Sequence, residues 1–364
     1  KITLRVSFVI LTTRQMASPR PPPQAARRHY NQKVHPVSAQ PAQQQRNQNQ
    51  QQRHLQHQLQ QQIKNNTKMM GMVGQQQHVN HSRAAAAAIT RTSPTKNLRV
   101  SNVVKKIYAD GEYEGDLNGE GEREGAGVMK YSEGDIYEGE WREDMMEGLG
   151  TMNYDDGDKY TGNFVQGNFD GPGEYWYRNG DHYKGEWKDD AFDGKGMYND
   201  HKGSKYDGAW KQDKMHGRGK YLDAAGNLYE GTFHQGKFQG AGKLNYVNGD
   251  FYEGDFRSGK RHGQGKCIDV DGNAYDGQWS ENKRSGYGTF RDVMGGIYKG
   301  NYKNDIRDGP GTYLWPEGQI DVTVCKENVR VGVGVGWSGD RKRAWRMVDG
   351  EYTGDVSLVE AHHI

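Results

Sequence analysis

Tyr160-Thr-Gly162-Asn-Phe164 returns as Tyr183-Lys-Gly185-Glu-Trp187, Tyr206-Asp-Gly208-Ala-Trp210 and Tyr229-Glu-Gly231-Thr-Phe233, each copy 23 residues after the one before. A fixed period of this length is typical of repeat proteins, in which each unit packs against its neighbours. We number positions within a unit from its first tyrosine, so the glycine is at +2 and the second ring at +4. The pattern predicts an array of repeats.

A second pattern completes each unit. Glycines at +11 and +13 are followed by an apolar residue at +15, and a further glycine stands at +20. Alternation with period two places the first tyrosine, the +2 glycine and the +4 ring on one face of a strand. The +20 glycine often follows Asn or Asp, as in Asn179-Gly180 and Asp271-Gly272, which is a strong turn signal. Each unit is therefore predicted to be a β-hairpin whose glycines leave room for its rings.

Nine regular units are predicted, and the first has one inserted residue. A degenerate tenth unit begins at Asp321, so the array spans 113–334. Residues 103–112 precede the array and resemble half a unit that would form the first edge strand. Successive hairpins would extend one twisted antiparallel sheet, an all-β, elongated single layer roughly 100 Å long. The nine units start at Tyr113, Tyr137, Tyr160, Tyr183, Tyr206, Tyr229, Tyr252, Tyr275 and Tyr298.

The composition suits a thin array. The chain has 51 Gly, 22 Tyr and 8 Trp but only 33% hydrophobic residues, so rings and glycines must do most of the packing. Cys267 and Cys325 would lie about five strands apart, roughly 24 Å at ~4.8 Å per strand. That separation is too large for a disulfide, so we expect two free thiols.

Charge divides the chain into a basic tail and an acidic body. Of the 49 Lys and Arg residues, 17 lie in residues 1–109, which leaves 32 against all 47 acidic residues, a net charge of −15. Residues 1–102, rich in Gln and Pro, are predicted to be disordered. They could bind an anionic membrane, an acidic protein or nucleic acid, or form a transit peptide or a dispensable extension. Met16 is a candidate translation start, in which case residues 1–15 carry no meaning.

Residues 335–364 follow the array. We expect Trp337 and Trp345 to cap the last edge of the sheet, with the cationic residues between them solvating it. A short basic helix that contacts a partner or a membrane is the alternative for this C-terminal extension.

Tyr-x-Gly-x-Trp, then Gly-x-Gly after six further residues, with a 23-residue period, resembles the MORN (membrane occupation and recognition nexus) repeat. The resemblance covers about residues 113–334, roughly 60% of the chain, and implies an elongated single antiparallel sheet. The sequence departs from the family at +7, where glycine is usual. Glycine is kept at +7 in three units, as Gly167, Gly236 and Gly259. In five other units the +7 residue is Asp144, Asp190, Asp213, Asn282 or Asp305. Asp and Asn also suit turns, so the hairpin prediction stands.

The sequence offers no catalytic arrangement. The Gly-x-Gly pairs recur in every unit without a following helix or Gly-Lys-Ser/Thr, which argues against a nucleotide site. The histidines fall in different repeats without metal-ligand spacing: His182, His201, His216, His234 and His262. Some MORN families carry a lipid kinase or lysine methyltransferase domain after the repeats, but about thirty residues follow the array here. We therefore expect no enzymatic activity, cofactor or metal.

The +4 and +15 rings would line one face of the sheet along its whole length. Exposed rings are favoured anchors for a partner helix or extended peptide, although the same rings could serve only to hold repeats together. The predicted groove consists of Trp141, Phe164, Tyr175, Trp187, Tyr198, Trp210, Tyr221, Phe233, Phe256, Trp279, Phe290, Tyr302 and Tyr313.

Three functions remain open at this point. The first is a non-catalytic scaffold that binds proteins, which the resemblance places in cilia, basal structures or membrane junctions. The second is association with anionic phospholipid, for which the basic tail is better suited than an acidic array. The third is a regulatory subunit of an enzyme supplied in trans. We expect a cytoplasmic location, with the cytoskeleton, cilium or membrane as sites of attachment, and no nucleic-acid partner; the oligomeric state stays undetermined.

Overall fold

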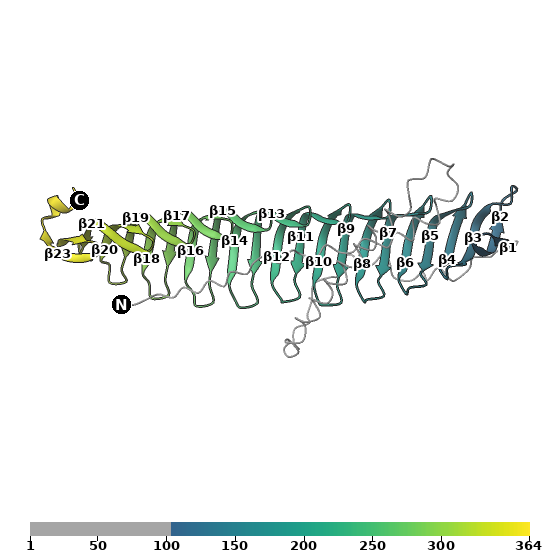
Figure 1. Cartoon of the computed structure of the whole chain (residues 1–364), viewed down its shortest axis with the longest axis horizontal. Coiled ribbons are helices and arrows are strands. Elements are labelled where there is room, and N and C mark those ends of the chain that lie inside the picture. The colour runs from purple at the N-terminus through teal and green to yellow at the C-terminus, as the bar shows by residue number, and fades with distance from the viewer. Residues whose placement is uncertain (1–102) are drawn as a thin grey trace, which may run out of the picture. The chain divides into compact units, whose positions relative to one another are not determined.

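The computed structural model describes residues 103–364, so the predicted tail 1–102 lies outside the described residues. The described chain is one open antiparallel sheet of 23 strands with a short helix, α3 (Leu358–Ala361), which confirms the all-β prediction (Figure 1). The strands are β1 Val104–Tyr108, β2 Gly111–Leu117, β3 Arg123–Tyr131, β4 Ile136–Arg142, β5 Met145–Asn153, β6 Lys159–Val165, β7 Asn168–Trp176, β8 His182–Lys188, β9 Ala191–Asn199, β10 Lys205–Lys211, β11 Lys214–Leu222, β12 Leu228–His234, β13 Lys237–Asn245, β14 Phe251–Arg257, β15 Lys260–Ile268, β16 Ala274–Ser280, β17 Lys283–Arg291, β18 Ile297–Lys303, β19 Ile306–Leu314, β20 Ile320–Lys326, β21 Val329–Trp337, β22 Ala344–Val348 and β23 Glu351–Val356.

The register sets glycine opposite glycine, both within a repeat and between neighbouring repeats. Between β8 and β9, Gly185 (+2) lies opposite Gly196 (+13). Between β7 and β8, the same Gly185 lies opposite Gly173, the +13 glycine of the preceding repeat. The pattern holds from Gly115 to Gly311, so a row of glycines crosses the sheet from strand to strand. We call this the glycine row.

Each hairpin bends beside the glycine row. The ladder within a repeat shifts register between the +2 glycine and the +4 ring, and the +11 glycine has positive φ, for example 62° at Gly217 and 107° at Gly194. A register shift of this kind bends and twists a strand pair. The bend folds the +4 end of each hairpin toward its own tyrosine, which gives a single layer a sheltered inner side.

Two kinds of connection form the long edges of the sheet. A two-residue turn at +6 and +7 joins the strands of a regular repeat, as in Asp189-Asp190 with φ of 48° and 64°. A five-residue loop joins one repeat to the next, as in 177–181, where the Gly180 N–H donates to the Tyr177 carbonyl. The Asn-Gly and Asp-Gly pairs thus belong to the longer loop, in which only the glycine has positive φ. We call the two sides the turn edge and the loop edge.

The two ends of the array continue the sheet. The predicted half repeat supplies β1, which pairs with β2, and the degenerate tenth repeat forms a hairpin of the same kind from β20 and β21. The C-terminal extension adds β22 and β23 to the sheet, so its basic segment is a turn followed by a strand and not a helix. Trp345 lies over Gly336, while Trp337 packs toward α3.

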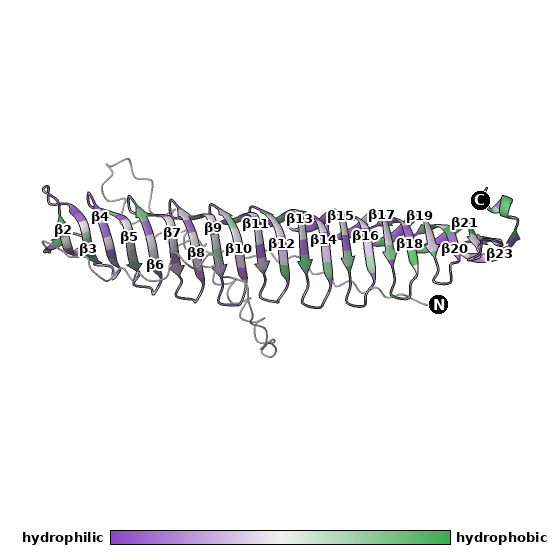
Figure 2. Ribbon diagram, turned by 180° about the vertical axis from the view of Figure 1, so that it is seen from behind, coloured by the Kyte–Doolittle hydropathy of each residue, from purple (hydrophilic) through white to green (hydrophobic). Residues whose placement is uncertain are grey.

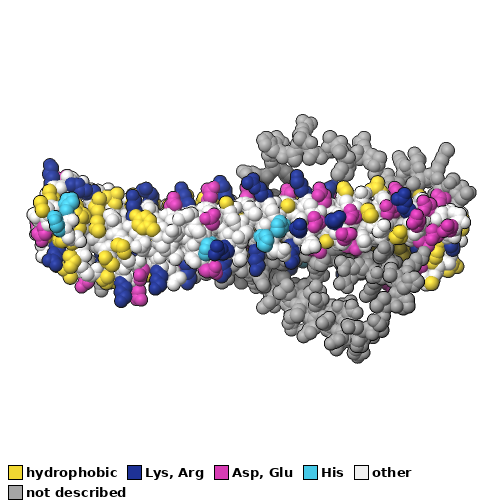
Figure 3. Space-filling model, turned by 90° about the horizontal axis from the view of Figure 1, so that it is seen from above, with side chains coloured by type: hydrophobic (Ala, Val, Ile, Leu, Met, Phe, Trp, Pro, Cys, Tyr) yellow, Lys and Arg dark blue, Asp and Glu magenta, His cyan; other side chains and the backbone are white. Residues whose placement is uncertain are grey.

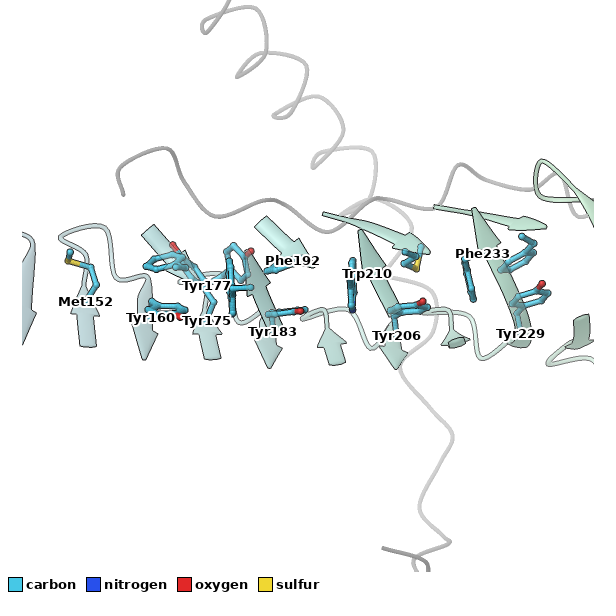
Figure 4. Packing of buried hydrophobic residues seen from close by; sticks show 14 of the residues in the cluster. Met152, Tyr160, Tyr175, Tyr177, Tyr183, Phe192, Tyr206, Trp210, Tyr229 and Phe233 are labelled. Atoms are coloured by element: carbon cyan, nitrogen blue, oxygen red, sulfur yellow. The ribbon is translucent and has the colours of Figure 1, made fainter. Parts of the chain in front are cut away.

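The core is a line of rings and not a layer of aliphatic side chains. Most strands mix hydrophobic and hydrophilic residues along their length (Figure 2), and β4 alternates strictly between exposed and buried positions. One hydrophobic cluster runs from Tyr113 to Tyr302. In Figure 4 the rings of successive repeats follow one another along the sheet. This core fits the predicted packing of rings against glycines.

Candidate functional site

The first tyrosine of each repeat lies flat across the glycine row. Tyr183 is completely buried, and a Cβ added to Gly196 would come within 2.3 Å of its hydroxyl oxygen. The same hydroxyl donates a hydrogen bond of 2.8 Å to the carbonyl oxygen of Glu186, the residue at the register shift. The glycine row is therefore a requirement of ring packing, because no side chain fits beneath the tyrosine.

The +4 ring joins consecutive repeats. Trp187 meets its own tyrosine, Tyr183, edge to face at 5.1 Å between ring centroids, and meets Tyr160 of the preceding repeat at 5.4 Å. Trp210 is placed in the same way, and its indole N–H donates to the Gly196 carbonyl at 3.0 Å. Edge-to-face pairs contribute about 0.5–1.5 kcal/mol each beyond burial. These rings hold each repeat to the one before it.

Position +9 is a core position that the sequence prediction missed. Phe192 stacks on Tyr183 with centroids 3.6 Å apart and also meets Trp210 of the next repeat at 5.3 Å. The signal was present in the sequence, since five consecutive repeats carry an apolar +9 residue. Those residues are Met146, Phe169, Phe192, Met215 and Phe238.

Arginine replaces the apolar +9 residue toward both ends of the array. The guanidinium of Arg261 lies 4.3 Å from the Trp279 ring and 5.6 Å from the Tyr252 ring, which is the place Phe192 takes between its two rings. Cation–π contact preserves the stack while the charged head keeps polar partners. The arginines at this position are Arg123, Arg261, Arg284, Arg307 and Arg330.

Asp and Asn at +7 clamp the turn edge. The backbone N–H of Phe192 donates to Asp213 Oδ1 of the next repeat at 2.8 Å, and the N–H of Asp213 donates back to the Phe192 carbonyl. Where +7 is glycine, as at Gly236, only the second of these bonds remains. Each departure from glycine at +7 therefore adds at least one inter-repeat hydrogen bond.

Comparison with known proteins identifies the repeat. The MORN repeat matches residues 110–136, 137–159, 160–182, 183–205, 206–228, 229–251, 252–274, 275–297 and 298–320. The chain belongs to the MORN-repeat family. The MORN match ends at residue 320, where β20 begins, so the degenerate tenth hairpin predicted from the sequence lies beyond the match.

Neither of the other comparisons adds to the MORN assignment. No curated protein matches the chain. The TCP10c domain of Drosophila melanogaster Sas-4 is 9% identical, with coverage of 55% of this chain and 98% of that domain and a TM-score of 0.25. The TCP domain of Drosophila SAS-4 bound to a proline-rich motif of Ana2 is 13% identical, with coverage of 65% and 97% and a TM-score of 0.18. We draw nothing from likenesses this weak.

Asp and Asn at +21 clamp the loop edge of the MORN array. Asp181 accepts from the backbone N–H of His201 at 2.9 Å and from the hydroxyl of Tyr198 at 2.7 Å. Burial by itself raises the pKa of Asp181, but hydrogen bonds from His201, Tyr198 and Asn179 outweigh it and lower that pKa overall. Asn227 and Asp250 bond in the same way to the next loop. Adjacent MORN repeats are thus clamped at both edges.

The predicted groove residues divide into two groups. Nine are at most 5% exposed and belong to the core: Trp141, Phe164, Tyr175, Trp187, Trp210, Phe233, Phe256, Trp279 and Tyr302. The remaining four are half-buried and pack at the margin of the same cluster: Tyr198, Tyr221, Phe290 and Tyr313. Only this second group presents ring surface to solvent.

Burial keeps several ionisable groups of the MORN array neutral. Burial raises the pKa of Tyr221 and Tyr302 to about 12, and raises that of the Cys267 thiol to about 11, which suppresses the reactive thiolate. Within residues 103–364 no three His, Cys, Asp or Glu side chains gather as a metal site would require. The described chain also contains no helix long and apolar enough to cross a membrane.

Proposed function

We propose that this MORN-repeat chain is a non-catalytic scaffold that binds a protein segment along the half-buried rings of its array. The observation that carries the proposal is the contrast between Tyr175, which is fully buried, and Tyr198 and Tyr221, which occupy the same +15 position but remain partly open. Half-open tyrosines in consecutive repeats are suitable anchors, since a ring offers large contact area at low entropic cost.

The chemistry of the array indicates the kind of segment. Like positions recur about every 10 Å, two strand spacings, so an extended or helical segment with regularly spaced apolar side chains would match them. The net charge of −15 over residues 110–364 favours a basic segment. A regulatory subunit of an enzyme supplied in trans would use the same rings.

The test places a photo-crosslinking amino acid at Tyr221 and identifies the captured protein. The affinity of that purified protein is then measured for the whole chain, for Tyr198→Ala/Tyr221→Ala, and for Trp176→Ala as a matched control. Trp176 is a partly exposed ring on the opposite face. Loss of two anchor rings should weaken binding about 30-fold or more, at about 1–2 kcal/mol per ring.

Two results would refute the scaffold proposal. One is equal affinity for the double variant and the native chain while circular dichroism reports an intact sheet. The other is a loss of binding in Trp176→Ala as large as in the double variant, because that would place the partner on the opposite face. Trp187 and Trp210 are unsuitable probes, since they are only 2–3% exposed and their removal would test the core.

A further inference from the structure

The turn edge changes the sign of its charge halfway along the array. Six residues of each regular repeat, from +5 to +10, form this edge, and the inserted residue lengthens the first segment. Repeats 1 to 4 contribute ten acidic and three basic residues there, and repeats 5 to 8 contribute eight basic and two acidic residues. The first set is 118–124, 142–147, 165–170 and 188–193; the second is 211–216, 234–239, 257–262 and 280–285.

Both halves carry charges that face solvent, although Asp190 and Arg284 are buried. Glu143 and Asp189 are exposed in the acidic half, as are Lys211 and Arg257 in the basic half. Figure 3 looks onto this edge and shows acidic side chains gathered at the end formed by β2 to β5. Some charges are already paired within the array, such as Arg123 with Asp144 at 3.2 Å, but an acidic excess remains in one half and a basic excess in the other.

The turn edge is also straight. The turns stand in one line along the upper side of the array in Figure 1, and the repeats follow one another at about 10 Å. Charges on such an edge form two adjoining stripes of opposite sign, an acidic one along repeats 1 to 4 and a basic one along repeats 5 to 8. A binding surface that matches both stripes must carry the reverse order of charge at the same period.

We propose that the turn edge pairs with the turn edge of a second copy of this chain, antiparallel, about a two-fold axis between repeats 4 and 5. An isologous interface of this kind places repeat 4 against repeat 5 of the partner, 3 against 6, 2 against 7 and 1 against 8. Every acidic segment then faces a basic one. The register holds over all eight repeats because both copies have the same period. A parallel pair would set acidic segments against acidic ones, so charge selects the antiparallel arrangement.

The two-fold axis predicts specific neighbours across the interface. Glu143 of repeat 2 lies opposite the repeat that contains Arg257, and Asp189 of repeat 4 lies opposite the repeat that contains Lys211. The pairing uses the turn edge and leaves the half-buried rings of the scaffold proposal free. The two proposals can therefore fail independently.

The test measures self-association of the full chain by analytical ultracentrifugation. We expect dimers at about 50 mM salt and monomers at about 500 mM, because the charges are exposed and screened. Lys211→Glu/Arg257→Glu should weaken the dimer about tenfold or more, and so should Glu143→Lys/Asp189→Lys. An equimolar mixture of these two variants should dimerise again, since both halves of the mixed interface become complementary. Lys205→Glu/Lys266→Glu, with the same charge change away from the turn edge, should associate as the native chain does.

Three outcomes would overturn the pairing. The first is a chain that is monomeric at low salt. The second is a dimer that withstands both reversals, which would place the interface elsewhere or assign it to the basic tail. The third is failure of the mixed variants to associate while each remains folded, in which case an acidic protein would be the better occupant of the basic stripe.

Discussion

Replacing Gly242 with alanine should open the array locally at repeat 6. A Cβ on Gly242 would lie 2.6 Å from both Cε2 and the hydroxyl oxygen of Tyr229, whereas carbon atoms pack at about 3.5–4.0 Å. The ring would have to move by about 1 Å or more. Movement breaks the 3.0 Å hydrogen bond from its hydroxyl to the Thr232 carbonyl and the stack on Phe238, 3.5 Å between centroids.

The cost follows from the contacts that are lost. Overpacking contributes about 1–3 kcal/mol, the hydrogen bond about 1 kcal/mol and the ring stack about 1 kcal/mol. Lower chain entropy of alanine offsets about 0.5–1 kcal/mol. The opening free energy of repeat 6 should therefore fall by about 2–4 kcal/mol, which corresponds to exchange about 30- to 900-fold faster at amides near Tyr229.

Hydrogen exchange followed by mass spectrometry measures this opening repeat by repeat. Gly240→Ala is the control, because Gly240 lies two residues away on the same strand with φ of 68° and no atom within 4 Å of an added Cβ. It should cost about 1–2 kcal/mol from backbone strain alone. Tyr229→Leu should remove most of the penalty of Gly242→Ala but none of that of Gly240→Ala. Equal penalties for the two alanine variants, or no coupling to Tyr229, would refute the packing argument.

Two further predictions concern the turn clamp and the tyrosine hydroxyls. Asp213→Asn should leave stability nearly unchanged, since Asn282 accepts the same hydrogen bond in repeat 8. Asp213→Gly should lower the free energy of unfolding in urea by about 1 kcal/mol. Equal effects of the two variants would contradict the clamp. Stability should also fall from about pH 10 upward, because burial raises the pKa of Tyr302 to about 12 while the unfolded side chain ionises near 10. The folded state then holds a proton that the unfolded state has lost. Tyr302→Phe, which introduces the residue type found at Phe256, should therefore reduce the fall in unfolding free energy between about pH 9 and about pH 11. An unchanged pH dependence in this variant would contradict the role of Tyr302.

The sequence predicted the parts of the fold that depend on period and residue size. Tyrosine and glycine recur in all nine units, and the +4 ring recurs in every unit after the first, so hairpins, their number and the shared face of rings and glycines could be derived. The apposition of Gly185 with Gly173 and Gly196 follows once each unit is a hairpin of fixed length. These features depend on neighbouring residues or recur in every repeat, so the same pattern could be read many times in one sequence.

The missed features depend on geometry within the repeat. Phe192 at +9 shares the face of +11 and +13 by period two, but only the register shift within the hairpin sets it opposite Trp187 in the core. The two-residue turn lies at Asp189-Asp190, where no glycine marks it, and the more visible Asn179-Gly180 occupies the longer loop. Burial of Trp187 could not be foreseen either, since only the bend shows that a single layer can enclose its own rings.

The edge clamps have a mechanical consequence. Because the strands cross the long axis of the array, its ladder hydrogen bonds run lengthwise, and tension on the two ends would separate neighbouring strands by peeling them from one margin. Asp213 and Asp181 fasten the margins where peeling would start. A stretched array should therefore yield in steps at its least fastened junctions, such as the one at Gly236, and keep its remaining hairpins intact.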